Sequence, residues 1–184
     1  MNIAFRLLLT LNATSLLVII FLVQKGYTLG YFLAEINGFN CLNFWPNGVS
    51  YVLYFLMPLL STKLSIYLSS WLGKDQFKND EIATIAYANN SFLPSYLGYF
   101  FVALSIDNWE ALWFVYSVLF LFTFMSQALY FNPLFLIFRY EFYNVTTKEG
   151  TTIFLISRHK YRKPNELEIP VAHRINNYTF IERG

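Results

Sequence analysis

Few side chains in this sequence are of the types that enzymes and metal sites use, and their spacing does not form a catalytic pattern. The two histidines, His159 and His173, stand fourteen positions apart, and Cys41 is the single cysteine. Zinc sites and metallopeptidases use HExxH or CxxC spacing, and the chain contains neither. It also lacks the GxGxxG, P-loop and GxSxG patterns. We therefore expect a protein that is not an enzyme and that holds no metal or cofactor.

Positive charge is concentrated in the hexapeptide RHKYRK, at residues 158–163. Its four fixed cations are Arg158, Lys160, Arg162 and Lys163. Beside a membrane these side chains could attract anionic lipid headgroups, at roughly 1 kcal/mol per residue. They could also dock an acidic partner, or serve only to keep this segment on the cytoplasmic side. Direct nucleic-acid binding is not expected, because so short a cluster contacts few phosphates.

A charged side chain, Lys63, lies inside the apolar stretch PLLSTKLSIYLSSWL. At 1.5 Å per helical residue it lies roughly 13 Å from the end of that stretch, near the middle of a bilayer core about 30 Å thick. Asn12 and Gln127 lie roughly 10 and 16 Å from the ends of their own apolar runs. Lys63, Asn12 and Gln127 are therefore predicted to share a mid-membrane polar layer. Alternatively, Lys63 is a structural hydrogen-bond donor or extends towards the inner interface.

Three small residues, Ser61, Ser65 and Ser69, recur every four positions in the same stretch. Small residues at this spacing let helices approach closely and form interhelical hydrogen bonds. Residues two positions apart on a helix are turned by about 200°, so Lys63 points away from Ser61. We expect one face of this helix to pack within its subunit and the other to contact a second copy in a homo-oligomer.

The elements that carry these residues are predicted to be membrane helices. Of the 184 residues, 56% are hydrophobic and 13% are charged. Four runs approach the roughly 20 apolar residues that span a bilayer, at 5–23, 49–72, 92–106 and 110–138. The third run is short unless residues 82–91 extend it, and the fourth must tilt or break at Pro133. The predicted fold class is an all-α membrane protein, with four transmembrane helices and a small cytoplasmic β-containing C-terminal tail.

Lysine and arginine are distributed unevenly along the chain. Eight of the thirteen lie after residue 138, and Arg6, Lys74 and Lys78 fall on the same side in this topology. The opposite side has only Lys25. Because cytoplasmic loops carry such an excess, we predict a multi-pass protein of the bacterial inner membrane with both termini cytoplasmic. The predicted parts are a membrane domain at residues 1–138 and a tail at residues 139–184.

The tail has the pattern of short strands. Two β-rich runs flank Gly150, which is typical of a hairpin with glycine in the turn, and NNYTFIERG offers a third strand. About 45 residues bury too little surface to fold alone. We expect support from a second copy, from the loop at residues 73–91, or from another protein.

In this layout, and in the tail text TTIFLISRHKYRKPNELEIP followed by INNYTFIERG, the chain resembles the small membrane subunit of the bacterial Kiwa anti-phage defence system. The resemblance covers the whole chain. It implies a homo-oligomeric inner-membrane protein, with a tetramer suggested, that detects phage infection at the envelope. It also implies a cytoplasmic, DNA-binding partner protein. No catalytic residues are implied.

The leading hypothesis is therefore a sensor and scaffold that contacts membrane lipids, detects infection at the envelope, and recruits or regulates a cytoplasmic effector. The first alternative is a small ion channel or transporter that uses Lys63, Asn12 and Gln127 as a polar path. A second alternative is a toxin-like or immunity-type membrane protein.

Overall fold

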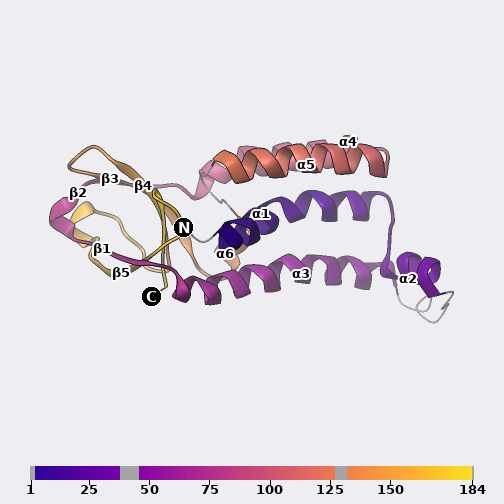
Figure 1. Cartoon of the computed structure of the whole chain (residues 1–184), viewed down its shortest axis with the longest axis horizontal. Helices are drawn as coiled ribbons and strands as arrows, with labels where there is room; N and C mark the ends of the chain where they lie inside the picture. Colours follow the sequence, from indigo (N-terminus) through magenta and orange to yellow (C-terminus); the bar gives the residue numbers. More distant parts are fainter. Residues whose placement is uncertain (1–2, 38–45, 127–131, 184) are drawn as a thin grey trace.

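The computed structural model describes residues 3–37, 46–126 and 132–183, and divides them into a group of helices with a β-sheet at one end (Figure 1). The helices are α1 (Ile3–Gln24), α2 (Leu29–Asn37), α3 (Asn47–Leu68), α4 (Leu93–Ser105), α5 (Trp109–Ser126) and α6 (Leu134–Ile137). The strands are β1 (Lys74–Phe77), β2 (Ile82–Tyr87), β3 (Glu141–Thr147), β4 (Thr152–Ser157), β5 (Ile169–Arg174) and β6 (Thr179–Glu182). Short 3-10 turns are η2 (Ser69–Trp71), η3 (Asn79–Glu81), η4 (Asn89–Phe92) and η5 (Pro164–Glu166).

The predicted all-α fold class with four spans is wrong. Among the described residues three helices are long and apolar enough to cross a membrane: Ile3–Gln24, Asn47–Trp71 and Trp109–Ser126. The expected third span forms only α4, whose 13 residues reach about 20 Å, well short of a bilayer core of about 30 Å. It cannot be extended backwards, because residues 82–87 form strand β2.

The expected fourth span, at residues 110–138, is not one continuous helix. Helix α5 ends at Ser126, and α6 begins after Pro133. Proline at the start of α6 is compatible with a helical first turn but not with a helix interior. This part of the chain therefore contributes one membrane-length helix and one short helix beside the sheet.

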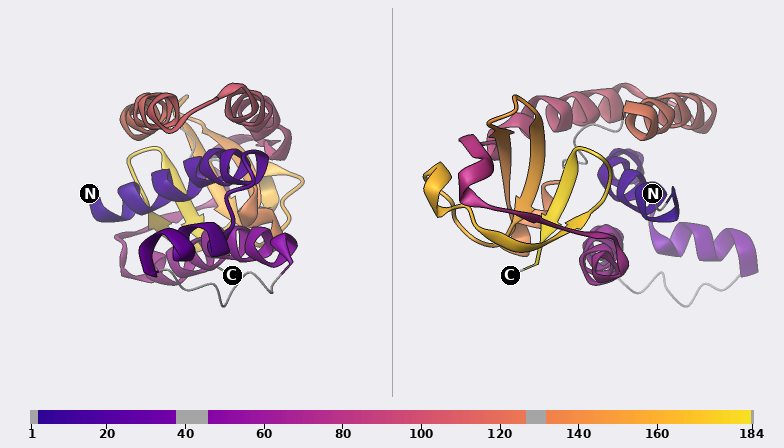
Figure 2. Two further views of the ribbon diagram at one scale, coloured as in Figure 1. Left: turned by 90° about the vertical axis from the view of Figure 1, so that its right-hand side faces the viewer. Right: turned by 60° about the vertical axis from the view of Figure 1, so that its left-hand side comes forward.

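The sheet has six strands in the order β1-β5-β6-β4-β3-β2, and it curls strongly (Figure 2). Strands β4 and β6 are parallel, and the other neighbours are antiparallel. The predicted hairpin is confirmed as β3 and β4, with Gly150 at φ 87° in the turn. Strands β1 and β2 come from the segment between α3 and α4. Of the three expected supports for the tail strands, the loop at residues 73–91 is the one that the structure shows.

Both faces of the central strand β4 are buried, which explains its unbroken apolar sequence. Phe154 and Ile156 point to the first face and join a core with Phe5 of α1 and Leu72 beyond α3. Leu155 points to the opposite face, into a second core inside the curled sheet. Side chains alternate between the faces of a strand, so β4 ties the two cores together.

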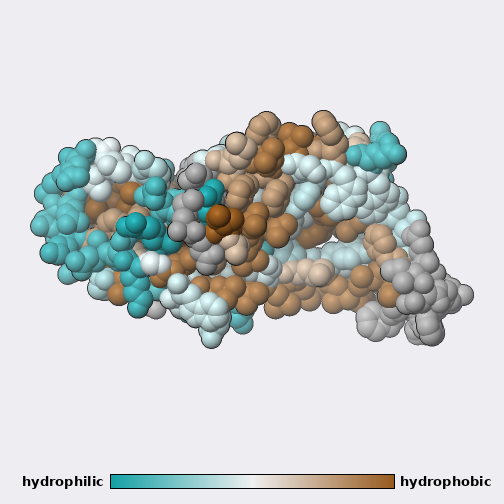
Figure 3. Space-filling model, in the orientation of Figure 1, coloured by the Kyte–Doolittle hydropathy of each residue, from teal (hydrophilic) through white to brown (hydrophobic). Residues whose placement is uncertain are grey.

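Helix α1 lies between α3 on one side and the α4–α5 pair on the other (Figure 2). Polar side chains are buried in this group, among them Thr10, Thr14 and Thr62. Large apolar side chains cover its outside, as the brown surface of Figure 3 shows. Examples are Leu60, Phe101, Phe114 and Phe122. The interior also holds apolar side chains, such as Leu9, Leu17 and Leu112. The apolar outside is what distinguishes this group from a water-soluble helical bundle, whose outer face is polar.

Truncation inside the curled sheet tests this arrangement. Leu155→Ala removes a fully buried side chain, and we expect a loss of about 2–5 kcal/mol of unfolding free energy. Val171→Ala on β5 is the control, because a half-exposed residue should cost no more than about 0.5 kcal/mol. Thermal unfolding of the detergent-solubilised full chain measures both. Equal, small effects would contradict the described core.

Candidate functional site

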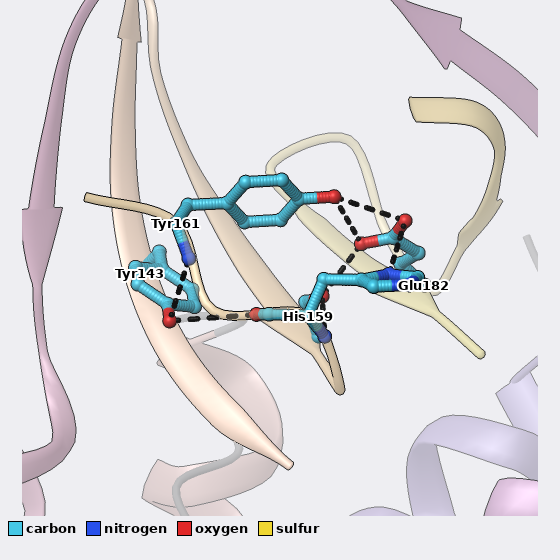
Figure 4. A network of polar contacts seen from close by, with 5 residues as sticks. Tyr143, His159, Tyr161 and Glu182 are labelled. Carbon is cyan, nitrogen blue, oxygen red and sulfur yellow. Dashed lines mark hydrogen bonds and ion pairs between the residues drawn. The ribbon is translucent and has the colours of Figure 1, made fainter. Parts of the chain in front are cut away.

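Glu182 is the centre of a network of polar contacts. Its carboxylate is buried at the end of β6. It accepts hydrogen bonds from Tyr161 Oη, which lies 3.0 Å from Oε1 and 2.9 Å from Oε2, and from Ser157 Oγ. His159 Nδ1 lies 3.1 Å from Oε1 (Figure 4). The loop that carries the basic hexapeptide is thereby tied to the sheet.

A second arm of the network runs through Tyr143 on β3. Its hydroxyl donates to Glu141 Oε2 at 2.6 Å and accepts from the backbone N–H of Tyr161 at 3.2 Å. Burial raises the pKa of Tyr143, and the hydrogen bond to Glu141 raises it further. Burial and the hydrogen bond to Glu182 likewise raise the pKa of Tyr161. Both phenols therefore stay protonated and act as donors at neutral pH.

The network does not resemble an activated nucleophile. Ser157 is fully buried, and its hydroxyl donates to a carboxylate instead of to a histidine. A catalytic serine needs a general base at its oxygen. Among the described residues, no group of three or more His, Cys, Asp or Glu side chains is placed to hold a metal ion. The hydrogen bonds of this network hold the loop at residues 158–163 in a fixed position.

All four predicted tail cations have exposed side chains. The Arg158 guanidinium lies 5.5 Å from the ring centre of Tyr140, beside the helices. Lys160 Nζ lies 3.4 Å from a carboxylate oxygen of Glu141. Arg162 and Lys163 directly precede η5, which lies against β2 and η3. The hexapeptide therefore presents its cations in two places.

The residues of the predicted polar layer lie in different environments. Asn12 is buried in α1, and its amide nitrogen has no hydrogen-bond partner among the described residues. Lys63 has an exposed side chain on α3. Gln127 lies outside the described residues. The shared layer stays a prediction.

The serine stripe of α3 is turned mostly inwards. Ser65 and Ser69 are fully buried and Ser61 is half-buried, while α3 packs against α1. Ser65 Oγ donates to the Thr62 carbonyl at 2.7 Å, and Ser69 Oγ donates to the Ile66 carbonyl at 2.7 Å. These hydroxyls are thus satisfied within their own helix, and their small size permits close packing inside the chain.

Two polar contacts were missed by sequence reasoning. Arg6 donates to the Phe124 carbonyl at 2.9 Å and lies 4.8 Å from the Phe124 ring centre, in the last turn of α5. A cation at a helix C-terminus is favourable, but Arg6 had been used only for orientation. Asn132 Nδ2 donates to Thr62 Oγ1 at 2.9 Å, deep in the structure. The sequence signal that could have indicated these contacts is a polar residue near the end of an apolar run, as Arg6 is in the first run and Asn132 in the fourth.

Removing the charge of Glu182 tests the network. Glu182→Gln keeps the shape but weakens charge-assisted hydrogen bonds, and we expect a loss of about 1–3 kcal/mol in stability. Trypsin should then cleave residues 158–163 faster, because the loop is released. Glu168→Gln is the control, since Glu168 is exposed. Equal cleavage rates in both variants and the native chain would show that the network does not hold the loop.

Comparison with known proteins gives one family. A family model described as anti-phage protein KwaA matches residues 5–181, nearly the whole chain. No curated protein and no solved structure matches the chain. The match confirms the resemblance predicted from the sequence, and the chain belongs to the KwaA family of anti-phage proteins.

Proposed function

We propose that this protein is a membrane-embedded sensor and scaffold for anti-phage defence, without enzymatic activity of its own. Anti-phage defence follows from the family. The membrane location is supported by one observation above all: large apolar side chains cover the outside of the helix group. Water would oppose that arrangement and a lipid environment favours it. The polar sheet then lies outside the bilayer, at one end of the helices (Figure 3).

The sheet end is the cytoplasmic end in this proposal. The described N-terminus and the C-terminal strand both lie there (Figure 1). Most lysines and arginines of the chain belong to the sheet and its loops, as cytoplasmic segments require. At the opposite end Lys25 is paired with Asp107 at 3.3 Å. The inner membrane of a bacterium, with both termini cytoplasmic, fits this distribution.

The sensing end is proposed to be the aromatic group where the helices turn, opposite the sheet. The Trp109 ring stacks on Tyr27 with 5.1 Å between ring centres, and packs edge-on against Phe21 at 5.3 Å. Phe21 belongs to α1, which also supplies Phe5 to the core beneath the sheet. A displacement of α1 by a disturbed envelope would therefore act on both ends.

The scaffold function is proposed to use Arg162 and Lys163 to dock a cytoplasmic partner, which by the resemblance is a DNA-binding protein. Both side chains are exposed, and the loop that presents them is ordered by Glu182. A homo-oligomer is supported by Lys63, because a charge exposed on a membrane helix is costly without a polar neighbour. A second copy would supply that neighbour. The resemblance suggests a tetramer.

Charge reversal tests the docking surface. Deletion of residues 158–184 is a poor test, because it also removes β5 and β6. The variant Arg162→Glu with Lys163→Glu leaves the sheet intact, and we expect loss of partner co-purification and of protection against phage. Lys148→Glu at the hairpin tip is the matched control. Full recruitment and protection in the double variant would contradict the docking role.

The alternative function, a small channel or transporter, is favoured by one observation: the buried amide nitrogen of Asn12 has no hydrogen-bond partner in the described part of the chain. A water-filled path would satisfy it. Ion flux through reconstituted vesicles decides between the two proposals. The sensor proposal expects no flux from the native chain and none from Lys63→Met. Flux that is lost in Lys63→Met would favour the channel.

A further inference from the structure

A set of cations borders the core that joins helices and sheet. Leu72 and Tyr140 belong to that core. Lys74 follows Leu72 by two residues, Arg139 directly precedes Tyr140, and Arg158 lies over the Tyr140 ring. Arg183 follows the last residue of β6, whose Ile181 is in the same core. We call Lys74, Arg139, Arg158 and Arg183 the basic arc.

Electrostatic effects on neighbouring groups agree with this placement. Burial raises the pKa of Tyr140, and the charges of Arg158 and Arg183 oppose that rise. Burial lowers the pKa of His173, and the charges of Arg183 and Lys74 lower it further. Arg183 is thus close both to Tyr140 and to His173. Arg158 and Arg183 thus share Tyr140 as a neighbour, and Arg183 and Lys74 share His173.

The basic arc is not neutralised by the chain. Among the described residues, none of its four members has a carboxylate within 4.0 Å, whereas Lys160 and Arg174 each form an ion pair. Cations that lack internal partners are available to an external anion. The four arc residues differ in this respect from Lys160 and Arg174, whose charges are already paired within the sheet.

Arg139, a member of the basic arc, has an unusual backbone conformation. Its φ of 64° lies in the left-handed region, where glycine is the common residue after a helix. Its N–H donates to the Leu136 carbonyl, and the N–H of Tyr140 donates to the Phe135 carbonyl. Tyr140 also packs on Phe135 at 6.0 Å. This is a Schellman motif with arginine at the position where glycine is usual. The left-handed backbone conformation disfavours residues with a side chain, yet arginine stands there.

The neighbours of the arc indicate its depth. Trp71 is 77% exposed, Tyr67 is 62% exposed and Ile137 is 55% exposed, and all three precede arc residues by at most seven positions. Exposed aromatic rings beside apolar helices are typical of the level of lipid headgroups. Lysine and arginine at that level face phosphates directly.

We infer that the basic arc, Lys74, Arg139, Arg158 and Arg183, binds anionic phospholipid headgroups at the cytoplasmic face and so seats the sheet on the membrane. The inference rests on the proposed membrane location. It gives the cations of the hexapeptide two different roles: Arg158 binds lipid, while Arg162 and Lys163 stay free for a protein partner.

Lipid titration of the purified full chain tests this inference. Phosphatidylglycerol is added to the protein in neutral detergent, with phosphatidylcholine in parallel, and bound lipid is counted by native mass spectrometry. Arg158→Gln or Arg183→Gln should each weaken phosphatidylglycerol binding about fivefold, and the double variant about 25-fold. Arg162→Gln and Lys163→Gln are the matched controls and should bind as the native chain does.

Arg139→Gly separates lipid binding from folding. Glycine suits the left-handed position, so the variant should be at least as heat-stable as the native chain in lipid-free detergent. Its phosphatidylglycerol binding should nevertheless fall about fivefold. This variant excludes misfolding as the reason for weaker binding.

The outcomes overturn different statements. Native-like phosphatidylglycerol binding in the Arg158, Arg183 and Arg139 variants overturns the inference, as does an equal loss in the two controls. Loss of partner capture by the arc variants with lipid binding unchanged also overturns it, in favour of protein docking. Extraction of the native chain from membranes by alkaline carbonate would instead overturn the proposed membrane location.

Discussion

The hydrophobic core between the helix ends and the sheet is the constraint on which the rest of the structure depends. It joins Phe5 of α1, Leu72 after α3 and Phe135 of α6 to Phe154 and Ile156 of β4. Without this core the sheet would have one uncovered apolar face, and the helices would end in exposed apolar side chains. Because interiors of this kind are close-packed, the two parts are expected to move together.

The polar network around Glu182 acts on the same sheet that this core fixes to the helices. Glu182 closes β6, and its contacts with Tyr161 and His159 hold the hexapeptide loop against the same sheet. The cations are therefore carried by an ordered loop on a sheet that is fixed to the helices. In the proposed function, a loop attached in this way presents different cations to the membrane and to a partner, which a disordered tail could not do reproducibly.

Part of this fold was predictable from local sequence. The hairpin was recognisable because Gly150 separates two β-rich runs, and α1 and α3 because their apolar runs exceed a bilayer's thickness. Strand β1 was missed because it is short and polar, and β2 because its apolar residues were taken as a possible extension of the third run. They become strands by pairing with β5 and β3, almost a hundred and about sixty residues away. The length of α4 was overestimated because hydropathy ignores where the preceding strand ends.

The candidate site was less accessible to prediction. The four tail cations were visible as a run of letters, but their separation into two places depends on Tyr140 and Glu141, which are distant in sequence. Counting residues along a helix predicted a depth for Asn12 and Lys63 but not the direction in which either side chain points. Arg6 was assigned to topology because its partner, a carbonyl in α5, carries no side-chain signature.

The central claim is that the sheet is built onto the helix ends through a shared core. Hydrogen exchange of the backbone amides of β4, measured on the full chain in lipid nanodiscs, tests it most directly. Residues 153–156 are expected to exchange as slowly as the middle of α1, and far more slowly than the hairpin tip at residues 148–151. Exchange in β4 as fast as at the hairpin tip, with α1 still protected, would show a tail that unfolds independently and would contradict the account.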